Sequence, residues 1–177
     1  MTASDQGPIA GFSDAHAGIL ARFERLRELP QMLADPARAD AARKFADEML
    51  RFFRHAVFEH HAEEEEALFP AVLRSAAPGD EKDLVRSLAA RLTREHRSLE
   101  AQWAQLEPAM KQLARGKPAD LDLAAVERLA AEYTEHARFE ESAWLPLSAR
   151  ILSSNDQAAL GLTLHMRHAL DKIVAHI

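Results

Sequence analysis

The stretch HHAEEEEALFP, residues 60–70, puts two histidines and four consecutive glutamates ahead of a proline inside an otherwise helical segment. His60 and Glu64 are four residues apart, so on one helix they face the same side. A second stretch, HARFEESAWLP at residues 136–146, repeats the pattern His-x3-Glu-Glu with a proline ten residues after the histidine. The chain therefore reads as two similar helical hairpins.

The segments around these two stretches are rich in Ala, Leu, Glu and Arg, which favour helix, and few turn signals separate them. Apolar residues recur at spacings of three and four, the pattern of a helix buried along one stripe, and no strand-like alternation is present. The sequence predicts an all-α protein with helices over residues 13–34, 38–76, 80–115, 120–151 and 156–175.

Composition narrows the possible functions. The 177 residues carry a net charge of -6 without a basic cluster, which argues against nucleic acid or an anionic membrane as partner. The absence of cysteine excludes disulfides, thiolate zinc and iron–sulfur clusters, so any metal must be held by histidine and carboxylate. No leader pattern and no apolar run of about 20 residues is found, and we expect a cytoplasmic protein.

Each of the first four predicted helices has one polar interruption in its apolar stripe. The first and third helices carry a single histidine there, and the second and fourth carry a histidine followed four residues later by a glutamate. The six residues are His16, His60, Glu64, His96, His136 and Glu140.

The depth of these histidines can be compared from the sequence alone. In an up-down bundle, two residues at equal depth are equidistant from the turn between their helices. The midpoints between successive histidines fall at 38, 78 and 116, which is two residues past Pro36, on Pro78 and on Gly116. The spacing therefore predicts that all four histidines lie in one layer.

Such a layer would bury two carboxylates, which costs several kcal/mol unless a cation compensates. No Lys or Arg lies on the stripes at this depth, so a bound metal is the expected compensation. Imidazoles with carboxylates suit iron or manganese better than calcium or magnesium, and six ligands are too many for one tetrahedral zinc. Two metals bridged by the carboxylates, with positions left open for dioxygen, peroxide or nitric oxide, fit this set.

The ordered series of six residues resembles the hemerythrin-like family, often called HHE cation-binding domains, over roughly residues 12–150. The resemblance implies an up-down four-helix bundle with an oxo- or hydroxo-bridged di-iron centre held by the same six residues; manganese or zinc could substitute. We expect the bundle at residues 12–152, a flexible N-terminus at 1–11, and a C-terminal helix in 153–177 that packs on the bundle or at a homodimer contact.

Two departures from oxygen-carrying hemerythrins concern the ligand set. Those proteins have a His-x3-His pair on the third helix, where this chain has Glu100, and a last carboxylate five residues after its histidine, where this chain offers Glu141 besides Glu140. Glu100 and Glu141 are therefore additional candidate ligands. One histidine fewer favours sensing or stress handling over bulk oxygen carriage. Whether the site turns over is left open; if it does, the chain is a peroxide- or nitric-oxide-processing oxidoreductase without a side-chain nucleophile.

Other polar residues near the layer have more ordinary interpretations. Glu63, Glu65 and Glu66 are expected in solvent, with a place as a ligand or as an acceptor behind a ligand left open for Glu65. His55 and His61 fall off the stripe and are expected to be exposed. Tyr133 and the two tryptophans, Trp103 and Trp144, are expected in the core.

The alternative function is a metal-free helical interaction or regulatory module, with the C-terminal helix as its contact surface. His165 and His168 on that helix are three residues apart. Packing of this helix is favoured over a second metal site there, although such a pair can bind zinc or nickel.

Overall fold

The computed structural model describes the backbone of residues 7–174 and the side chains of residues 7–169, and within this part of the chain every regular element is helical. The predicted all-α class is confirmed. Residues 1–6 and 175–177, which include part of the predicted N-terminal and C-terminal segments, lie outside the described residues.

Five helical stretches follow one another along the chain. The first consists of α1 (Pro8–Leu26) and, after a short break, α2 (Leu29–Ala34). The second begins with η1 (Pro36–Arg38) and runs on through α3 (Ala39–Phe52), η2 (Phe53–Val57), α4 (Phe58–Glu63), η3 (Glu64–Leu68) and α5 (Phe69–Ser75). The remaining three are α6 (Asp80–Ala114), the continuous series α7 (Leu123–Phe139), η4 (Glu140–Trp144) and α8 (Leu145–Ile151), and α9 (Ser154–Val174).

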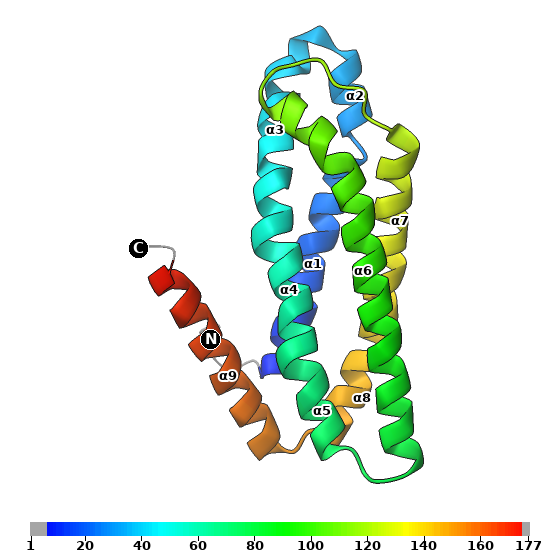
Figure 1. Cartoon of the computed structure of the whole chain (residues 1–177), viewed down its shortest axis with the longest axis vertical. Helices are drawn as coiled ribbons and strands as arrows, with labels where there is room; N and C mark the ends of the chain where they lie inside the picture. Colours follow the sequence, from blue (N-terminus) through cyan, green and yellow to red (C-terminus); the bar gives the residue numbers. More distant parts are fainter. Residues whose placement is uncertain (1–6, 175–177) are drawn as a thin grey trace.

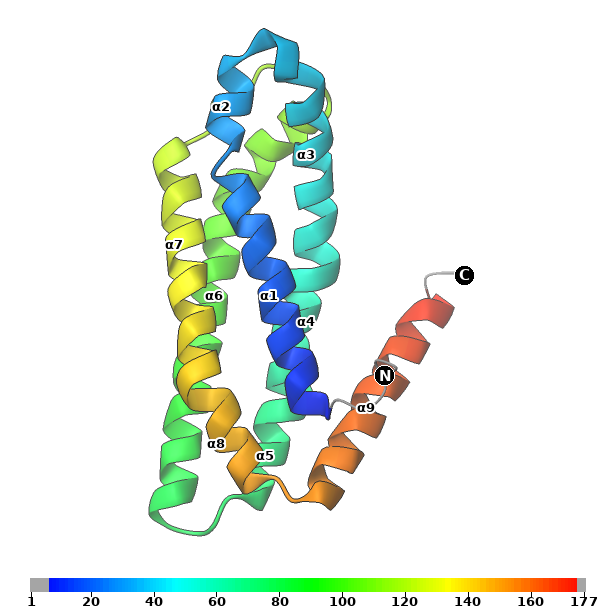
Figure 2. The ribbon, with the colours of Figure 1, turned by 180° about the vertical axis from the view of Figure 1, so that it is seen from behind.

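The first four stretches form an up-down four-helix bundle, in which α3 packs on α6, α6 on α7, and α7 on α1 (Figure 1). The helix α2 and the connection between α6 and α7 lie at one end of the bundle. The helix α9 leaves the other end at an angle and packs against the beginning of α1, as the reverse view in Figure 2 makes clear. Within the described residues, no helix combines the length and apolarity needed to cross a bilayer.

The turns form where the sequence signals predicted them. Gly79 and Gly116 have φ angles of 94° and 69°, a left-handed conformation that glycine adopts without strain. The N-terminal boundary differs from expectation, because α1 begins at Pro8 and residues 8–11 are therefore helical. Proline is well tolerated in the first turn of a helix. The N–H groups of that turn have no acceptor within the helix, so the N–H that proline lacks costs no hydrogen bond.

The core consists of two apolar clusters, and along each bundle helix the change from one cluster to the other occurs at the polar layer. One cluster is built around Phe23, Phe53 and Trp103, the other around Phe69 and Trp144. The tryptophans are therefore in the core, as predicted. The polar layer lies between two regions that exclude water.

Candidate metal centre

Two π-helical turns shape the repeated motif. In η3, the Phe69 N–H donates to the carbonyl of Glu64, and in η4 the Leu145 N–H donates to the carbonyl of Glu140, both five residues apart instead of four. The proline of each repeat follows directly and cannot donate an N–H of its own. Turns of this kind are frequent at functional sites. Here they hold the buried glutamate of each motif at the start of a widened turn.

A third π-turn, η2, explains why His61 is buried although its position off the apolar stripe predicted an exposed residue. The Phe58 N–H donates to the carbonyl of Phe53, which inserts one extra residue into the turn before the motif. Val57 therefore faces the core, and both His60 and His61 turn inward. His61 is 1% exposed, so the prediction of an exposed residue was wrong. The spacing of four between Val57 and His61 was the available signal.

The structure brings together all six predicted residues and adds His61. These seven side chains are buried, and they share one unusual property: the atoms they turn toward one another have no hydrogen-bond partner. The atoms are Nε2 of His16, His60, His61, His96 and His136, and both carboxylate oxygens of Glu64 and Glu140. Orphaned polar atoms this deep in a protein are rare, which makes the cluster a strong candidate for a bound cation.

The seven side chains divide into two groups, each with its candidate ligand atoms within 4.8 Å of one another. We call the first group, which includes the two carboxylates, the two-histidine position, and the second the three-histidine position. The groups are His16 and His60 with Glu64 and Glu140, and His61, His96 and His136.

The two carboxylates lie between these positions. One oxygen of Glu64 is 3.6 Å from Nε2 of His60, and its other oxygen is 3.2 Å from Nε2 of His96. One oxygen of Glu140 is 2.9 Å from Nε2 of His16 and 3.2 Å from Nε2 of His136. Each carboxylate can therefore reach a cation in either position.

Four of the five histidines donate their Nδ1–H to a carboxylate behind the ring. A carboxylate only accepts, so in the neutral ring this bond fixes the tautomer whose Nε2 lone pair faces the cluster. The pairs are His16 with Glu141 at 2.7 Å, His61 with Glu100 at 2.9 Å, His96 with Glu65 at 2.8 Å, and His136 with Glu95 at 2.9 Å.

The two additional candidate ligands lie behind histidines and not at the metal positions themselves. Glu100 and Glu141 lie behind imidazoles and not among the inward-facing atoms, and Glu65 is the acceptor that the sequence allowed it to be. Glu65 and Glu141 are the second glutamates of the two repeats, and each supports a histidine of the other hairpin. Glu95 was missed, because its contact with His136 crosses from α6 to α7 and no sequence spacing announces it.

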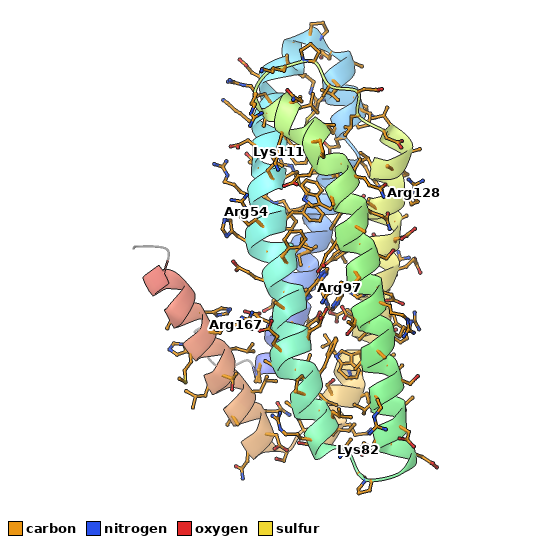
Figure 3. All side chains as sticks on the ribbon, in the orientation of Figure 1. Arg54, Lys82, Arg97, Lys111, Arg128 and Arg167 are labelled. Carbon is orange, nitrogen blue, oxygen red and sulfur yellow. The ribbon has the colours of Figure 1, made fainter. Side chains whose placement is uncertain are left out.

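Within residues 7–169, arginines hold the carboxylates only on the three-histidine side. Arg97 donates to Glu65 and to Glu100, the latter at 2.9 Å, and Arg91 donates to Glu95 at 2.6 Å. Figure 3 labels Arg97 near the middle of the bundle's length.

On the two-histidine side, the support is thinner. Glu141 accepts a hydrogen bond from the Ser13 hydroxyl at 2.8 Å. Among the described side chains, no carboxylate accepts a hydrogen bond from the ring of His60. The two positions are therefore supported unequally.

The pKa values reflect a cluster of buried groups that compensate one another without metal. Burial alone would lower the pKa of His16 and His96, but the neighbouring Glu140 and Glu64 raise these values to about 9 and about 10. Burial beside a second carboxylate raises the pKa of Glu64 to about 8. For Glu140, burial raises the pKa, but this effect is outweighed by the nearby imidazoles of His16, His96 and His136, and the pKa is lowered.

Burial keeps two histidines and Tyr133 neutral. Burial lowers the pKa of His61 to about 4, and that of His60 well below its ordinary value. Burial and the nearby carboxylates Glu64 and Glu140 raise the pKa of Tyr133, whose hydroxyl is buried without a hydrogen-bond partner. The Tyr133 ring lies 5.7 Å from that of His136, so the side chain belongs to the core, as predicted, but also borders the cluster.

Two cavities reach the layer from outside. A groove of about 610 Å³ between α6 and α7 is lined by Glu95 and His136. A cavity of about 530 Å³ between α1, α4 and α9 is lined by His60. Each position is therefore adjacent to a separate cavity.

A family model described as Hemerythrin HHE cation binding domain matches residues 7–148, which span the whole polar layer and end just before the close of α8. Among curated proteins, no significant match to the chain was found.

Proposed function

The chain belongs to the hemerythrin HHE cation-binding domain family, and from this premise we propose that its polar layer holds two iron ions that bind or react with dioxygen, peroxide or nitric oxide. The observation that carries the proposal is the set of nine buried, inward-facing polar atoms without hydrogen-bond partners. A protein interior tolerates such a set when a cation satisfies it.

The donor set fits two ions of a transition metal. Five imidazole nitrogens and four carboxylate oxygens are too rich in nitrogen for calcium or magnesium and too many for one tetrahedral zinc. Iron suits this mixture, and manganese or zinc could replace it. The carboxylates Glu64 and Glu140, which lie between the positions, are the residues suited to hold both ions at once.

The two positions differ in how many protein atoms they offer. The three-histidine position offers three nitrogens and, with one oxygen from each carboxylate, about five donors, whereas the two-histidine position offers about four. A small ligand has more room at the two-histidine position. His61 also supplies a fifth histidine, so the histidine count no longer separates oxygen carriage from reactivity.

Residues around the layer favour reaction or sensing over bulk carriage. When bound, the ions would supply Lewis acidity and electrons to a small ligand. Tyr133 keeps its proton and can donate a hydrogen bond beside the layer. The groove between α6 and α7 brings the polar side chain of Glu95 next to His136, which gives protons a path toward the site.

The proposal is tested by anaerobic iron loading followed by exposure to dioxygen, peroxide and nitric oxide in turn. We expect about two irons per chain and near-ultraviolet absorption after oxidation. We also expect a change in the spectrum with at least one of the three small molecules. Stable, reversible dioxygen binding without oxidation would contradict the preference for sensing or stress handling. A chain that stays folded, colourless and metal-free would favour the helical interaction module instead.

A further inference from the structure

The cavity beside the two-histidine position is closed on one side by α9, a helix that lies beyond the part of the chain matched by the family model. The helix packs on α1, η3 and α5, and its ion pair between Arg167 and Glu66, 2.6 Å long, fastens it to the bundle. Figure 3 shows Arg167 on the side of α9 that faces the bundle. The wall that α9 contributes to this cavity therefore lies outside the part of the chain that the family model matches.

The inner end of the cavity is His60. Its side chain is buried, and its Nε2 has no hydrogen-bond partner. It is also the histidine without a carboxylate behind its ring among the described residues. A group that enters the cavity from solvent thus reaches a histidine of the two-histidine position.

Besides His60, three lining residues of the cavity have metal-binding side chains, and the others are glycine, proline or apolar. Glu63, next to Glu64 in the sequence, contacts Nε2 of His168, and His165 lies one helical turn before His168 on the same helix. The Glu63 side chain is 16% exposed and that of His168 is 57% exposed, so the pair reaches from the wall toward solvent. A neutral gas needs no such groups, whereas a divalent transition-metal ion binds imidazole and carboxylate.

We propose that this cavity is the port through which divalent iron reaches the two-histidine position, and that His165, His168 and Glu63 form its docking site. The inference rests on the proposed function, because it assumes that the layer binds metal. The incoming cation displaces the contact between Glu63 and His168, binds to their side chains, and passes to His60. The net charge of -6 draws the cation toward the chain, and the Glu63 carboxylate concentrates it at the port.

Cobalt(II) loading of the full chain tests the docking site, because the visible spectrum of bound cobalt reports occupancy without any reaction. We expect H165Q/H168Q to slow loading about tenfold while the final spectrum and the number of bound ions stay unchanged. The matched control is H55Q, which removes an exposed histidine that is also near a glutamate, with Nδ1 of His55 3.5 Å from Glu59, but outside the cavity. Equal loading rates in H165Q/H168Q and the wild type would overturn the port.

A pair of glycines on α1 tests the cavity itself. A Cβ atom added at Gly11, which lines the cavity, or at Gly18, which does not, would meet no atom within 4 Å, so a substitution can begin at both sites without a clash. We expect Gly11→Leu to narrow the cavity and slow cobalt loading, and Gly18→Leu to load at the wild-type rate. Equal slowing by both variants would count against the cavity as the route.

Failure of the port and failure of the proposed function give different results. A wild-type chain that takes up no cobalt or iron contradicts the proposed metal centre and the port with it. A wild-type chain that fills both positions at a rate indifferent to His165, His168 and Gly11 contradicts the port alone. Weak zinc binding that persists in His60→Ala and disappears when H165Q/H168Q is added would support the docking site independently of the centre.

Discussion

The two-histidine and three-histidine positions arise from a repeated sequence motif, yet their histidines differ in the carboxylates and arginines that support them. All three imidazoles of the three-histidine position are backed by carboxylates, and Arg91 and Arg97 hold those carboxylates. In the two-histidine position only His16 has such a partner, and His60 borders a cavity. Symmetry in the sequence therefore produced an asymmetric site, because His61 and Glu95 have no counterparts in the repeat.

This difference in support predicts that one position retains its ion and that the other exchanges it. A carboxylate behind an imidazole orients the ring and makes its free nitrogen a better ligand, so we expect the three-histidine position to hold its ion more firmly. The two-histidine position has fewer donors and an adjacent cavity, so we expect it to exchange ions and ligands. The shared carboxylates are what couple the two.

Removing a carboxylate that both positions share should abolish metal binding at both of them. Glu64→Gln removes the carboxylate charge that bound ions require and replaces one of its two donor oxygens by an NH2 group, and we expect neither ion to be retained while the helical fold survives. The fold survives because the pKa of Glu64 is raised to about 8 in the metal-free chain, so the neutral Gln replaces a carboxyl that is already neutral at pH 7. Metal analysis with circular dichroism measures both effects, and Glu66→Gln, at an exposed neighbour, is the control. Two ions retained in Glu64→Gln would reject the assignment.

Removing one histidine should affect the positions separately. His61→Ala leaves two nitrogens in the three-histidine position, and His60→Ala leaves one in the other. We expect the wild type to release its ions to a chelator in two phases, His61→Ala to lose the slow phase, and His60→Ala to lose the fast one. Loss of the same phase in both variants would show that the positions are not distinct.

His61 also marks the limit of what the sequence could predict. Helix propensity, apolar spacing and turn signals were sufficient for an all-α fold and for the common depth of the six predicted residues, since both depend on local spacing. The π-turn at η2 adds a residue to the turn, so that His61 turns inward beside His60, and the four-residue spacing between Val57 and His61 was the only sign of it in the sequence. Glu95 and Arg97 act across helices, and such contacts require the packed bundle.

The number of protons released when metal binds should show how the protonated groups of the metal-free chain are divided between the two positions. His16, His96 and Glu64 have pKa values raised to about 9, 10 and 8, so all three carry protons at neutral pH and must lose them when metal binds. Affinity should therefore rise with pH, by up to about tenfold per unit for each released proton, and level off above about pH 10. His60 and His61, whose pKa values are lowered, contribute no proton.

Calorimetry with cobalt(II) or zinc in buffers of different ionisation enthalpy counts the released protons. We expect about one proton from each position and one from the shared Glu64. Affinity that stays constant between pH 6 and 8 would contradict the assigned protonation states.

A smaller effect is expected from the carboxylates behind the rings. Glu65→Ala removes the acceptor of His96 and should weaken the three-histidine position by roughly 10- to 100-fold. Glu141→Ala, which removes the acceptor of His16, should weaken only the two-histidine position by a similar factor. Chelator titration followed phase by phase distinguishes the two variants. An effect of either variant on both phases would mean that the carboxylates act on the fold and not on single histidines.

The smallest effect should come from Arg97, which touches the centre only through Glu65 and Glu100. Its side chain is 57% exposed, and ion pairs of this kind contribute about 0.2–1 kcal/mol, so Arg97→Gln should weaken the three-histidine position by no more than roughly fivefold. Salt screens exposed charges, so the difference from the wild type should shrink at about 1 M salt. Arg128→Gln, higher on α7 in Figure 3, is the control. A larger, salt-independent loss in Arg97→Gln would mean that the arginine fixes the geometry of both carboxylates, and that the asymmetry between the positions begins at the protein surface.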